Sequence, residues 1–341
     1  MPNSASRPAL CAVLLWLVSA AAYAAPASLK TLPPGPRPLQ VTVGTYLIDF
    51  EKIDETTLTH TISAYLTVQW RDPRLAKGQG SDIDPMSVTL DQIWNPNIEI
   101  TNQHTPREIA NSMLTLDDDG TITYYERFKG ELATDFDLKR FPFDRQMLLL
   151  QIESFRFTLA DVKFVARDMR QLKSPAAFLP DWVIDDVSQR IDTDDYNPEQ
   201  QVYSRYTFDI EVARKRGYYV WNVFLPLTFI TLLVWSVFFI TPEDVATRSA
   251  VSITSLLTAI AFSLVISGTR PRVSYLTFMD AVFLNAYFLI FLTTASVIAA
   301  HFLLVRSGTP EGAQRLSRVG QRYFPLLLLV SNLVVFVVFL L

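Results

Sequence analysis

Cysteine is almost absent from this chain, and the absence excludes two kinds of chemistry. The 341 residues contain a single cysteine, Cys11, which lies in an apolar stretch near the start. If that stretch is removed on export, no residue remains for a disulfide or a reactive thiolate. Exported domains commonly carry disulfides because the export route is oxidising. This chain must therefore hold its loops by packing and polar contacts.

Histidine is equally scarce, and the three that occur, His60, His104 and His301, are far apart in the sequence. They show no metal-ligand spacing, and neither a glycine-rich phosphate loop nor a nucleophile elbow accompanies them. We therefore expect no metal, no cofactor and no enzymatic activity.

Apolar residues, by contrast, make up 50% of the chain, which is too many for a wholly soluble protein of this length. At the start, Arg7 precedes an apolar core from Ala9 to Val18, and Ala22-Tyr23-Ala24 forms a small-x-small cleavage site. We predict a signal peptide over residues 1–24. A membrane anchor is the alternative, although the apolar run is shorter than the roughly 20 residues of a span.

The first half of the chain reads as an exported β-sandwich. After a proline-rich linker at 25–38, residues 39–214 contain β-branched and aromatic runs with turn-forming DDDG and YNPEQ between some of them. This spacing predicts an all-β, immunoglobulin-like sandwich of about ten antiparallel strands. The runs are VTVGTYLIDF, HTISAYLTVQW, GTITYYERF, MLLLQIESF and YTFDIEV.

Charge is distributed unevenly between the two halves. Residues Ala25 to Ala213 hold 30 Asp and Glu against 19 Lys and Arg, a net charge of −11, and the rest of the chain is basic. An acidic exported half argues against nucleic acid as a partner, because nucleic acid requires a basic face.

The second half, residues 215–341, reads as a four-helix membrane domain. Each of four apolar stretches can cross about 30 Å of hydrocarbon as a helix. The stretch between the third and fourth carries Arg306, Arg315, Arg318 and Arg322, which places it in the cytoplasm and the sandwich outside. With about 18 residues on the cytoplasmic side there is no room for a kinase, a cyclase or a nucleotide-binding domain. The predicted spans are 217–240, 245–267, 274–304 and 323–341.

The second span is rich in hydroxyl groups and carries a distinctive stripe. Residues at 250, 254, 257, 261 and 264 fall on one face of a helix. That face is polar or small toward the cytoplasm and apolar toward the outside, which suits a water-filled pore with a hydrophobic constriction. The alternative is a buried bundle helix whose hydroxyls bond to its own carbonyls. One helix cannot enclose a pore, so the first interpretation requires a symmetric ring of subunits. The stripe consists of Ala250, Thr254, Leu257, Ala261 and Leu264.

Five short motifs in a fixed order resemble those of the pentameric ligand-gated ion channels, the Cys-loop receptor superfamily, in its bacterial, cysteine-free form. The resemblance runs from about residue 39 to 341 and implies a homopentamer in a bacterial inner membrane with the sandwich in the periplasm. The motifs are WRDPRL (Trp70 to Leu75), IWNP (Ile93 to Pro96), FPFD (Phe141 to Asp144), ARKRGYYVW before the first span and YFP (Tyr323 to Pro325) at the last.

The resemblance implies that the FPFD loop lies at the membrane boundary and transmits gating. Animal members close this loop with two cysteines, and the matching positions here are Thr134 and Leu148. We expect the two rings to dock on the linker between the second and third spans, and Asp144 to pair with Arg214. A loop that only covers the end of the sandwich is the alternative. The expected gating residues are Phe141, Pro142, Phe143, Asp144, Arg214, Pro271 and Tyr275.

The resemblance also places an agonist outside the membrane, between neighbouring subunits. Aromatic rings and carboxylates at the matching positions favour a small amine, by cation–π attraction and charge pairing. Met113 stands where a bacterial relative carries a basic residue, and some of the tyrosines could be ordinary strand residues. Proton gating is the rival, because carboxylates are plentiful. The residues are Glu99, Asn102, Glu153, Phe155, Tyr196 and Tyr203, with Tyr46 and Tyr65 from the facing subunit.

Ion selectivity follows from the inner mouth of the pore. Alignment from Pro271 places the family's basic position at Arg248, and the nearest acids, Glu243 and Asp244, lie a turn or more farther in. The acidic sandwich would concentrate cations above the pore. We therefore expect a cation-conducting channel whose partners are an agonist, inorganic ions, membrane lipid and further copies of itself. An anion-conducting channel and a non-conducting membrane receptor are the alternatives.

Overall fold

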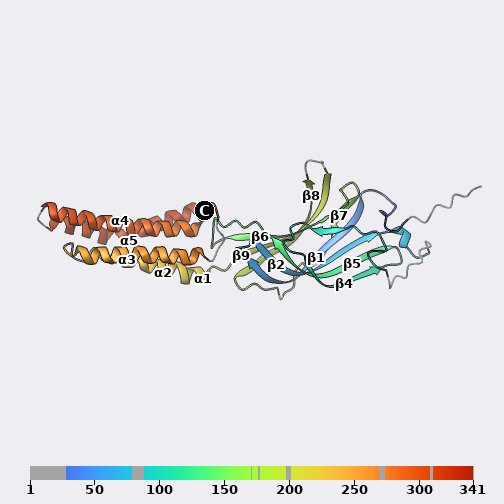
Figure 1. The fold of residues 1–341 in the computed structure, drawn as a ribbon, viewed down its shortest axis with the longest axis horizontal. Coiled ribbons are helices and arrows are strands. Elements are labelled where there is room, and N and C mark those ends of the chain that lie inside the picture. Colours follow the sequence, from blue (N-terminus) through green and yellow to red (C-terminus); the bar gives the residue numbers. More distant parts are fainter. Residues whose placement is uncertain are drawn as a thin grey trace, which may run out of the picture.

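The computed structural model has two parts, a β-sandwich at one end and a bundle of helices at the other (Figure 1). It describes residues 28–78, 88–169, 171–175, 177–196, 201–268, 273–307 and 310–340. The predicted signal peptide and Pro271 lie outside these residues. The C-terminus lies at the end of the bundle nearest the sandwich (Figure 1).

The sandwich consists of two sheets with nine strands among the described residues. The five-stranded sheet has the order β4-β5-β2-β1-β7 and the four-stranded sheet the order β3-β6-β9-β8. All strand pairs are antiparallel except β1 with β7. The strands are β1 (Leu39–Asp54), β2 (Thr59–Arg71), β3 (Ile98–Ile100), β4 (Glu108–Leu116), β5 (Thr121–Ala133), β6 (Arg145–Ser154), β7 (Val162–Ala166), β8 (Trp182–Tyr196) and β9 (Gln201–Arg214).

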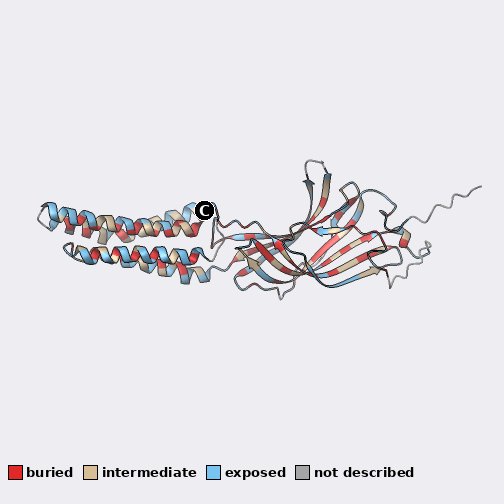
Figure 2. Ribbon diagram, in the orientation of Figure 1, coloured by how far each residue is buried: buried red, intermediate tan, exposed pale blue. Residues whose placement is uncertain are grey.

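Alternation of apolar and polar side chains produces the core between the sheets. In β2, Ile62, Ala64, Leu66, Val68 and Trp70 are buried and the residues between them are not. This period of two is what a half-buried strand requires. Buried residues accordingly concentrate between the two sheets (Figure 2).

The predicted linker is partly built into the sandwich. Trp94 donates its backbone N–H to the Leu29 carbonyl at 2.6 Å. Arg74, held by Asp72, donates to the carbonyl oxygens of Ser28 and Thr31. The described part of residues 25–38 therefore packs on the domain, contrary to a free linker.

Four helical segments long enough to span a membrane follow. The first, Gly217–Phe239, comprises α1 (Gly217–Tyr219), a π-helical turn (Val220–Phe224), α2 (Leu225–Ser236) and a 3₁₀ turn. The π turn ends just before Pro226, which has no N–H to continue the regular hydrogen bonds. The other helices are α3 (Val245–Ser267), α4 (Phe278–Ser307) and α5 (Glu311–Leu340).

Two helix starts differ from the sequence prediction. Helix α4 begins at Phe278, four residues after the predicted start. Helix α5 begins at Glu311, so the stretch carrying Arg315, Arg318 and Arg322 is its first turns. The sequence prediction missed these charged turns because it considered only the length of the apolar stretch. Gly320 permits this part of α5 to lie against the Phe238 ring, which would overlap a Cβ at that position.

A buried ion pair lies at the end of the sandwich that is next to the helices. Arg214, the last residue of β9, donates from Nε and Nη2 to the two carboxylate oxygens of Asp144, at 2.8 and 3.0 Å. Its Nη1 donates to Glu55 at 2.5 Å, and its guanidinium lies over the rings of Trp182 and Phe141. Burial acts to lower the pKa of Arg214, but the hydrogen bonds and charges of Asp144 and Glu55 outweigh it and raise that pKa. The predicted Asp144–Arg214 contact is therefore present.

The two rings of the FPFD loop dock on the helical part of the chain. Phe141 is buried against Tyr219, with centroids 5.0 Å apart. Phe143 lies between Phe224 and Phe278, at 6.1 and 5.4 Å. Aromatic pairs at these separations are favourable beyond the area they bury.

The described end of the linker and the start of α4 bond to the backbone just before the FPFD motif. The hydroxyl of Tyr275 accepts a hydrogen bond from the Leu138 N–H at 3.0 Å, and the Lys139 carbonyl accepts one from Phe278 at 2.8 Å.

Polar contacts hold the loop at the position where animal members have cysteines. The Thr134 N–H donates to the Leu58 carbonyl at 2.9 Å, and its hydroxyl lies 2.5 Å from Nδ1 of buried His60. The other matching position, Leu148, is fully buried in the core. One end of the loop is thus held by hydrogen bonds and the other by packing.

Replacing Asp144 with asparagine should destabilise the protein strongly. The change leaves the Arg214 charge buried with only Glu55 beside it, and breaking a buried pair costs about 3–5 kcal/mol. We expect the thermal midpoint of the purified protein, followed by tryptophan fluorescence, to fall by roughly 10 °C.

The matched control is Asp119→Asn, which removes an exposed carboxylate 3.8 Å from Arg71. Such a pair contributes about 0–1 kcal/mol, so the midpoint should hardly move. Equal shifts of the thermal midpoint in the two variants would show that the buried Asp144–Arg214 pair stabilises the protein no more than an exposed pair does.

Candidate functional site

Helix α3 leaves one stripe of its surface uncovered by the rest of the chain. Ala250, Thr254, Leu257, Ala261 and Leu264 are all exposed. The two leucines are 62% and 68% exposed, although leucine is usually buried. These are the five residues that the helical spacing predicted on one face. The stripe is therefore free to face a pore or another subunit.

The hydroxyls of α3 divide between two roles. Ser252 and Ser255 are buried against the bundle, and Ser252 donates to the Arg248 carbonyl one turn earlier. Thr258 donates to Thr254 in the same way, and Tyr287 of α4 bonds Ser263. One face of α3 is thus buried against the bundle, as the alternative prediction has it, and the stripe on another face is exposed.

The inner end of α3 differs from the prediction at Arg248. This side chain is 1% exposed and points into the bundle, where Nη2 donates to Ser317 of α5 at 3.2 Å. It therefore does not line a mouth in this structure. Glu243 and Asp244 are exposed, and Asp244 caps α3 by accepting the Thr247 N–H at 3.0 Å.

The predicted agonist carboxylates lie side by side but differ in availability. Glu99 of β3 pairs across the sheet with Glu153 of β6. Glu153 is buried, and Arg205 of β9 holds its carboxylate and that of Asp194. Arg205 was missed from sequence, because only strand register shows that it faces Glu153. Glu153 is not open to a ligand, whereas Glu99 is exposed.

The side chain of Asn102 bonds to backbone groups of two neighbouring strands. Its amide donates to the carbonyls of Leu149 and Ala133, at 2.8 and 3.2 Å. Its oxygen accepts the Gln151 N–H at 3.1 Å. These bonds tie β5 to β6, so the polar atoms of the side chain are occupied.

The predicted aromatic residues flank this carboxylate region. Phe155, which follows β6, is 70% exposed. Tyr203 of β9 is partly exposed, and its hydroxyl donates to Gln201 at 2.7 Å. Tyr196 ends β8 opposite Gln201, and its side chain lies outside the described part.

The other predicted aromatics lie together on the five-stranded sheet. Tyr46 of β1 and Tyr65 of β2 are cross-strand partners, and Arg127 of β5 lies beside Tyr65 with its guanidinium 6.0 Å from the ring centre. Tyr65 is 45% exposed and Met113 of β4 57%. The cation Arg127 was absent from the sequence prediction, which compared only the motif positions. Strand pairing alone brings it to the tyrosines.

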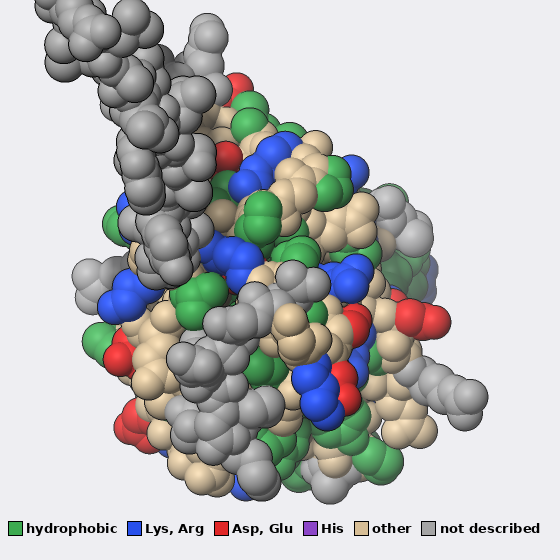
Figure 3. Space-filling view, turned by 90° about the vertical axis from the view of Figure 1, so that its right-hand side faces the viewer, with side chains coloured by type: hydrophobic (Ala, Val, Ile, Leu, Met, Phe, Trp, Pro, Cys, Tyr) green, Lys and Arg blue, Asp and Glu red, His purple; other side chains and the backbone are tan. Residues whose placement is uncertain are grey.

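Charge of one sign does not cluster on the end of the sandwich farthest from the helices. Figure 3 views this end, and basic and acidic side chains are interspersed over its described surface. Among the described residues, no group of three or more His, Cys, Asp or Glu could hold a metal ion.

Two family models match the two parts of this chain. The model described as neurotransmitter-gated ion-channel ligand binding domain matches residues 29–216. The model described as neurotransmitter-gated ion-channel transmembrane region matches residues 223–332. Together they cover the sandwich, the FPFD loop and most of the helices.

Individual relatives agree with the family models. A proton-gated ion channel of Gloeobacter violaceus is 27% identical over 307 residues, covering 89% of this chain and 84% of the relative. A gamma-aminobutyric acid receptor subunit beta-4 of Gallus gallus is 26% identical, covering 84% of this chain. A gamma-aminobutyric acid receptor subunit beta-like protein of Drosophila melanogaster is 28% identical over 79% of this chain.

The chain spans 60% and 57% of the lengths of these two animal relatives. The family models cover both its ligand-binding domain and its membrane helices, and their order is that of the fold described above. The chain therefore belongs to the neurotransmitter-gated ion-channel family of Cys-loop receptors, and it is a multi-pass ligand-gated ion channel with an extracellular ligand-binding domain rather than an enzyme.

Proposed function

We propose that five copies of this chain form a channel in which α3 lines the pore and Leu257 and Leu264 form its constriction. The observation that carries the proposal is the uncovered stripe of α3, which mixes small, hydroxyl and leucine side chains. A ring of leucine side chains that narrows a pore can close it by excluding water. One helix cannot enclose a pore, and a rotationally symmetric ring of copies would bring the five stripes around one central axis.

The agonist that fits the exposed groups is a small amine. Glu99 supplies a carboxylate, and Phe155 and Tyr203 supply rings beside it on the four-stranded sheet. Tyr46 and Tyr65 would face them from the neighbouring subunit, since they lie on the other sheet. An ammonium group gains from both ring faces and the charge.

We further propose that the pore conducts cations. Glu243 and Asp244 are exposed at the inner end of α3, whereas the guanidinium of Arg248 points into the bundle and bonds Ser317. The negative charge of each sandwich is repeated five times above the pore and raises the local cation concentration.

Substituting Leu257 with serine should ease opening. A hydroxyl at the constriction stabilises water in the closed pore, so less agonist is needed and resting current rises. Current recorded in oocytes under a panel of small amines should show half-maximal activation at about tenfold lower concentration.

The control is Leu333→Ser, which makes the same change on an exposed position of α5. It should leave activation unchanged, because α5 does not line the proposed pore. A channel in which both serines act alike, or a purified pentamer that never conducts, would overturn this assignment. Ligand binding without current would favour the non-conducting receptor.

Substituting Phe155 with alanine should weaken amine activation. Loss of one cation–π partner costs about 0.5–2 kcal/mol, or roughly 2- to 30-fold in the concentration for half-maximal current. Ile109→Ala, at an exposed position on the other sheet, is the control and should have no effect. An unchanged amine response in the Phe155 variant would show that the agonist does not bind beside Phe155.

Acid is a second candidate signal, and His60 favours it. Burial lowers the pKa of His60 to about 3. Its Nε2 has no hydrogen-bond partner, and its Nδ1 meets Thr134 at the start of the FPFD loop. A histidine exposed by loop movement takes up a proton below about pH 6.5. Between pH 6.5 and 3 the unfolded or opened state takes up a proton on His60 that the folded state does not. The contribution of the buried neutral ring to the free energy of unfolding is therefore present above pH 6.5 and is lost as the pH falls toward 3.

Current measured as the pH is lowered from 7 to 4 tests this candidate. If acid acts through His60, the His60→Gln variant should lose most of the pH dependence while keeping its amine response. The exposed His104 provides the control as His104→Gln. Equal pH curves for all three proteins would exclude His60 as the sensor.

A further inference from the structure

The edge of β1 that faces β7 has a gap in its strand pairing. Up to Val43 this edge is paired, and the N–H of Arg167, just after β7, donates to the Val43 carbonyl at 2.8 Å. Farther along, the Leu47 N–H donates to the Leu172 carbonyl, also at 2.8 Å. Alternate residues of a strand turn their N–H groups to the same edge, so the N–H of Thr45 points into the gap. Thr45 is fully buried, and a buried N–H without a partner is costly.

The hydroxyl of Tyr206 reaches this N–H from the opposite sheet. It accepts the Thr45 N–H at 3.0 Å and donates to Oε1 of Gln189 on β8 at 2.9 Å. Tyr206 belongs to β9 and is fully buried, so its side chain bridges the core between the two sheets. Burial raises the pKa of Tyr206 to about 12, so the hydroxyl keeps the proton that it donates.

Gln189 closes these contacts into a ring. Its Nε2 donates to the Arg167 carbonyl at 2.5 Å, and the Arg167 N–H returns to Val43, two residues before Thr45. Hydrogen bonds in a buried network support one another, and the loss of one member leaves its neighbours unsatisfied. We call this set the Tyr206 ring, and its members are Val43, Thr45, Arg167, Gln189 and Tyr206.

The Tyr206 ring lies directly behind both proposed agonist faces of the subunit. On the five-stranded sheet, Tyr46 follows Thr45 in β1. On the four-stranded sheet, Tyr203 lies three residues before Tyr206 in β9. In a pentamer these two faces belong to two different agonist regions, because each region lies between neighbouring subunits.

We propose that Tyr206 is a positioning residue that couples the two agonist regions to which each subunit contributes. The inference rests on the proposed amine site and pentamer. A shift of β8 and β9 around a bound agonist is passed through the Tyr206 ring to β1, and so to the region shared with the next subunit. Binding at one region then raises the affinity at the next, and the response becomes steeper than that of independent sites.

Hydrogen–deuterium exchange of the purified whole protein tests the ring without an agonist. Tyr206→Phe removes only the hydroxyl, and Gln189→Met removes its acceptor. Each change should speed exchange in peptides covering residues 43–47 and 187–191 about tenfold, because the ring opens and a buried polar group loses its partner. The double variant should exchange no faster than Tyr206→Phe, since both changes open the same ring.

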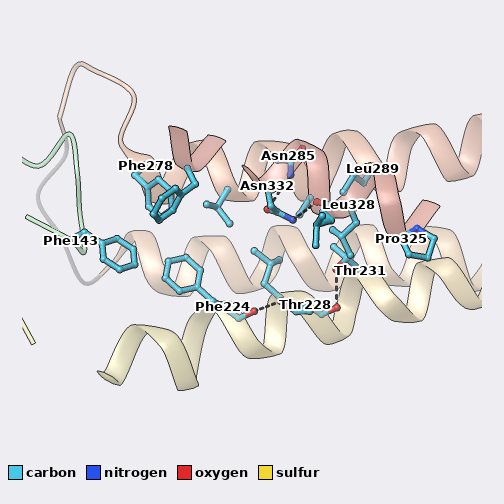
Figure 4. Close-up of a pocket in the computed structure, with 15 residues that line it drawn as sticks. Phe143, Phe224, Thr228, Thr231, Phe278, Asn285, Leu289, Pro325, Leu328 and Asn332 are labelled. Atoms are coloured by element: carbon cyan, nitrogen blue, oxygen red, sulfur yellow. Dashed lines mark hydrogen bonds between the residues drawn. The ribbon is translucent and has the colours of Figure 1, made fainter. Parts of the chain in front are cut away.

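The control for exchange is Asn285→Leu, which breaks a polar bridge in the helix bundle. There Asn285 of α4 donates to Asn332 of α5 at 3.2 Å (Figure 4). Exchange in the two sandwich segments should not change in this variant. Fold-changes of the single variants that multiply in the double variant, or faster exchange confined to one sheet, would overturn the coupling.

Currents evoked in oocytes by ethylamine, propylamine and ethanolamine test the coupling of agonist regions. The Hill coefficient should fall from about 2 in the unmodified protein to about 1 in Tyr206→Phe, with the maximal current unchanged. Loss of folded protein alone would lower the maximal current and leave the slope as it was. Tyr125→Phe removes a half-buried hydroxyl on β5, outside the ring, and should change neither. If Tyr206→Phe does not fold, Gln189→Met, at a half-buried position, must still lower the slope.

Failure of this inference and failure of the proposed agonist give different results. An unchanged Hill coefficient in Tyr206→Phe or in Gln189→Met would overturn the role of Tyr206, even though amines open the channel. An unmodified protein that ignores all three amines, with the exchange results as expected, would instead overturn the proposed agonist and leave the coupling of the two sheets through Tyr206 supported.

Discussion

The paired hydrogen bonds between Arg214 and Asp144 are the constraint on which the rest of this molecule depends. Arg214 ends the last strand of the sandwich, and Asp144 closes the FPFD loop, whose rings rest on the helices. A guanidinium bound on two edges and covered by rings has one orientation. A movement of β9 is therefore transmitted directly to the loop that contacts α1, the π-helical turn and α4.

Much of the fold could be predicted because its patterns are local. The alternation that marks β2 and the 23 residues of α3 can be recognised without any knowledge of tertiary contacts. Strand β8 was missed because its run of aspartates obscures the alternation, and its pairing with β9 decides its structure. The start of α5 was missed for a related reason, since charge marks a boundary of the membrane and not of the helix.

The candidate site divides in the same way. The stripe of α3 follows from helical geometry, so its five residues could be selected from spacing. The roles of Glu153, Asn102 and Arg248 depend on partners far away in the sequence, to which their side chains are bound. The same long-range register brings Arg127 beside Tyr65. Motif matching finds where such residues lie but not what they already bind.

Helix α5 is longer than a membrane requires. Its 30 residues extend about 45 Å, whereas the hydrocarbon is about 30 Å thick. Its apolar part can move along the bilayer normal only until the exposed Arg315, Arg318 and Arg322 would leave the water. These arginines therefore resist movement of the helix into the hydrocarbon. In a thinner bilayer the helix would tilt and not shift along the bilayer normal. Bilayer thickness thus acts on α5 as a mechanical variable in its own right.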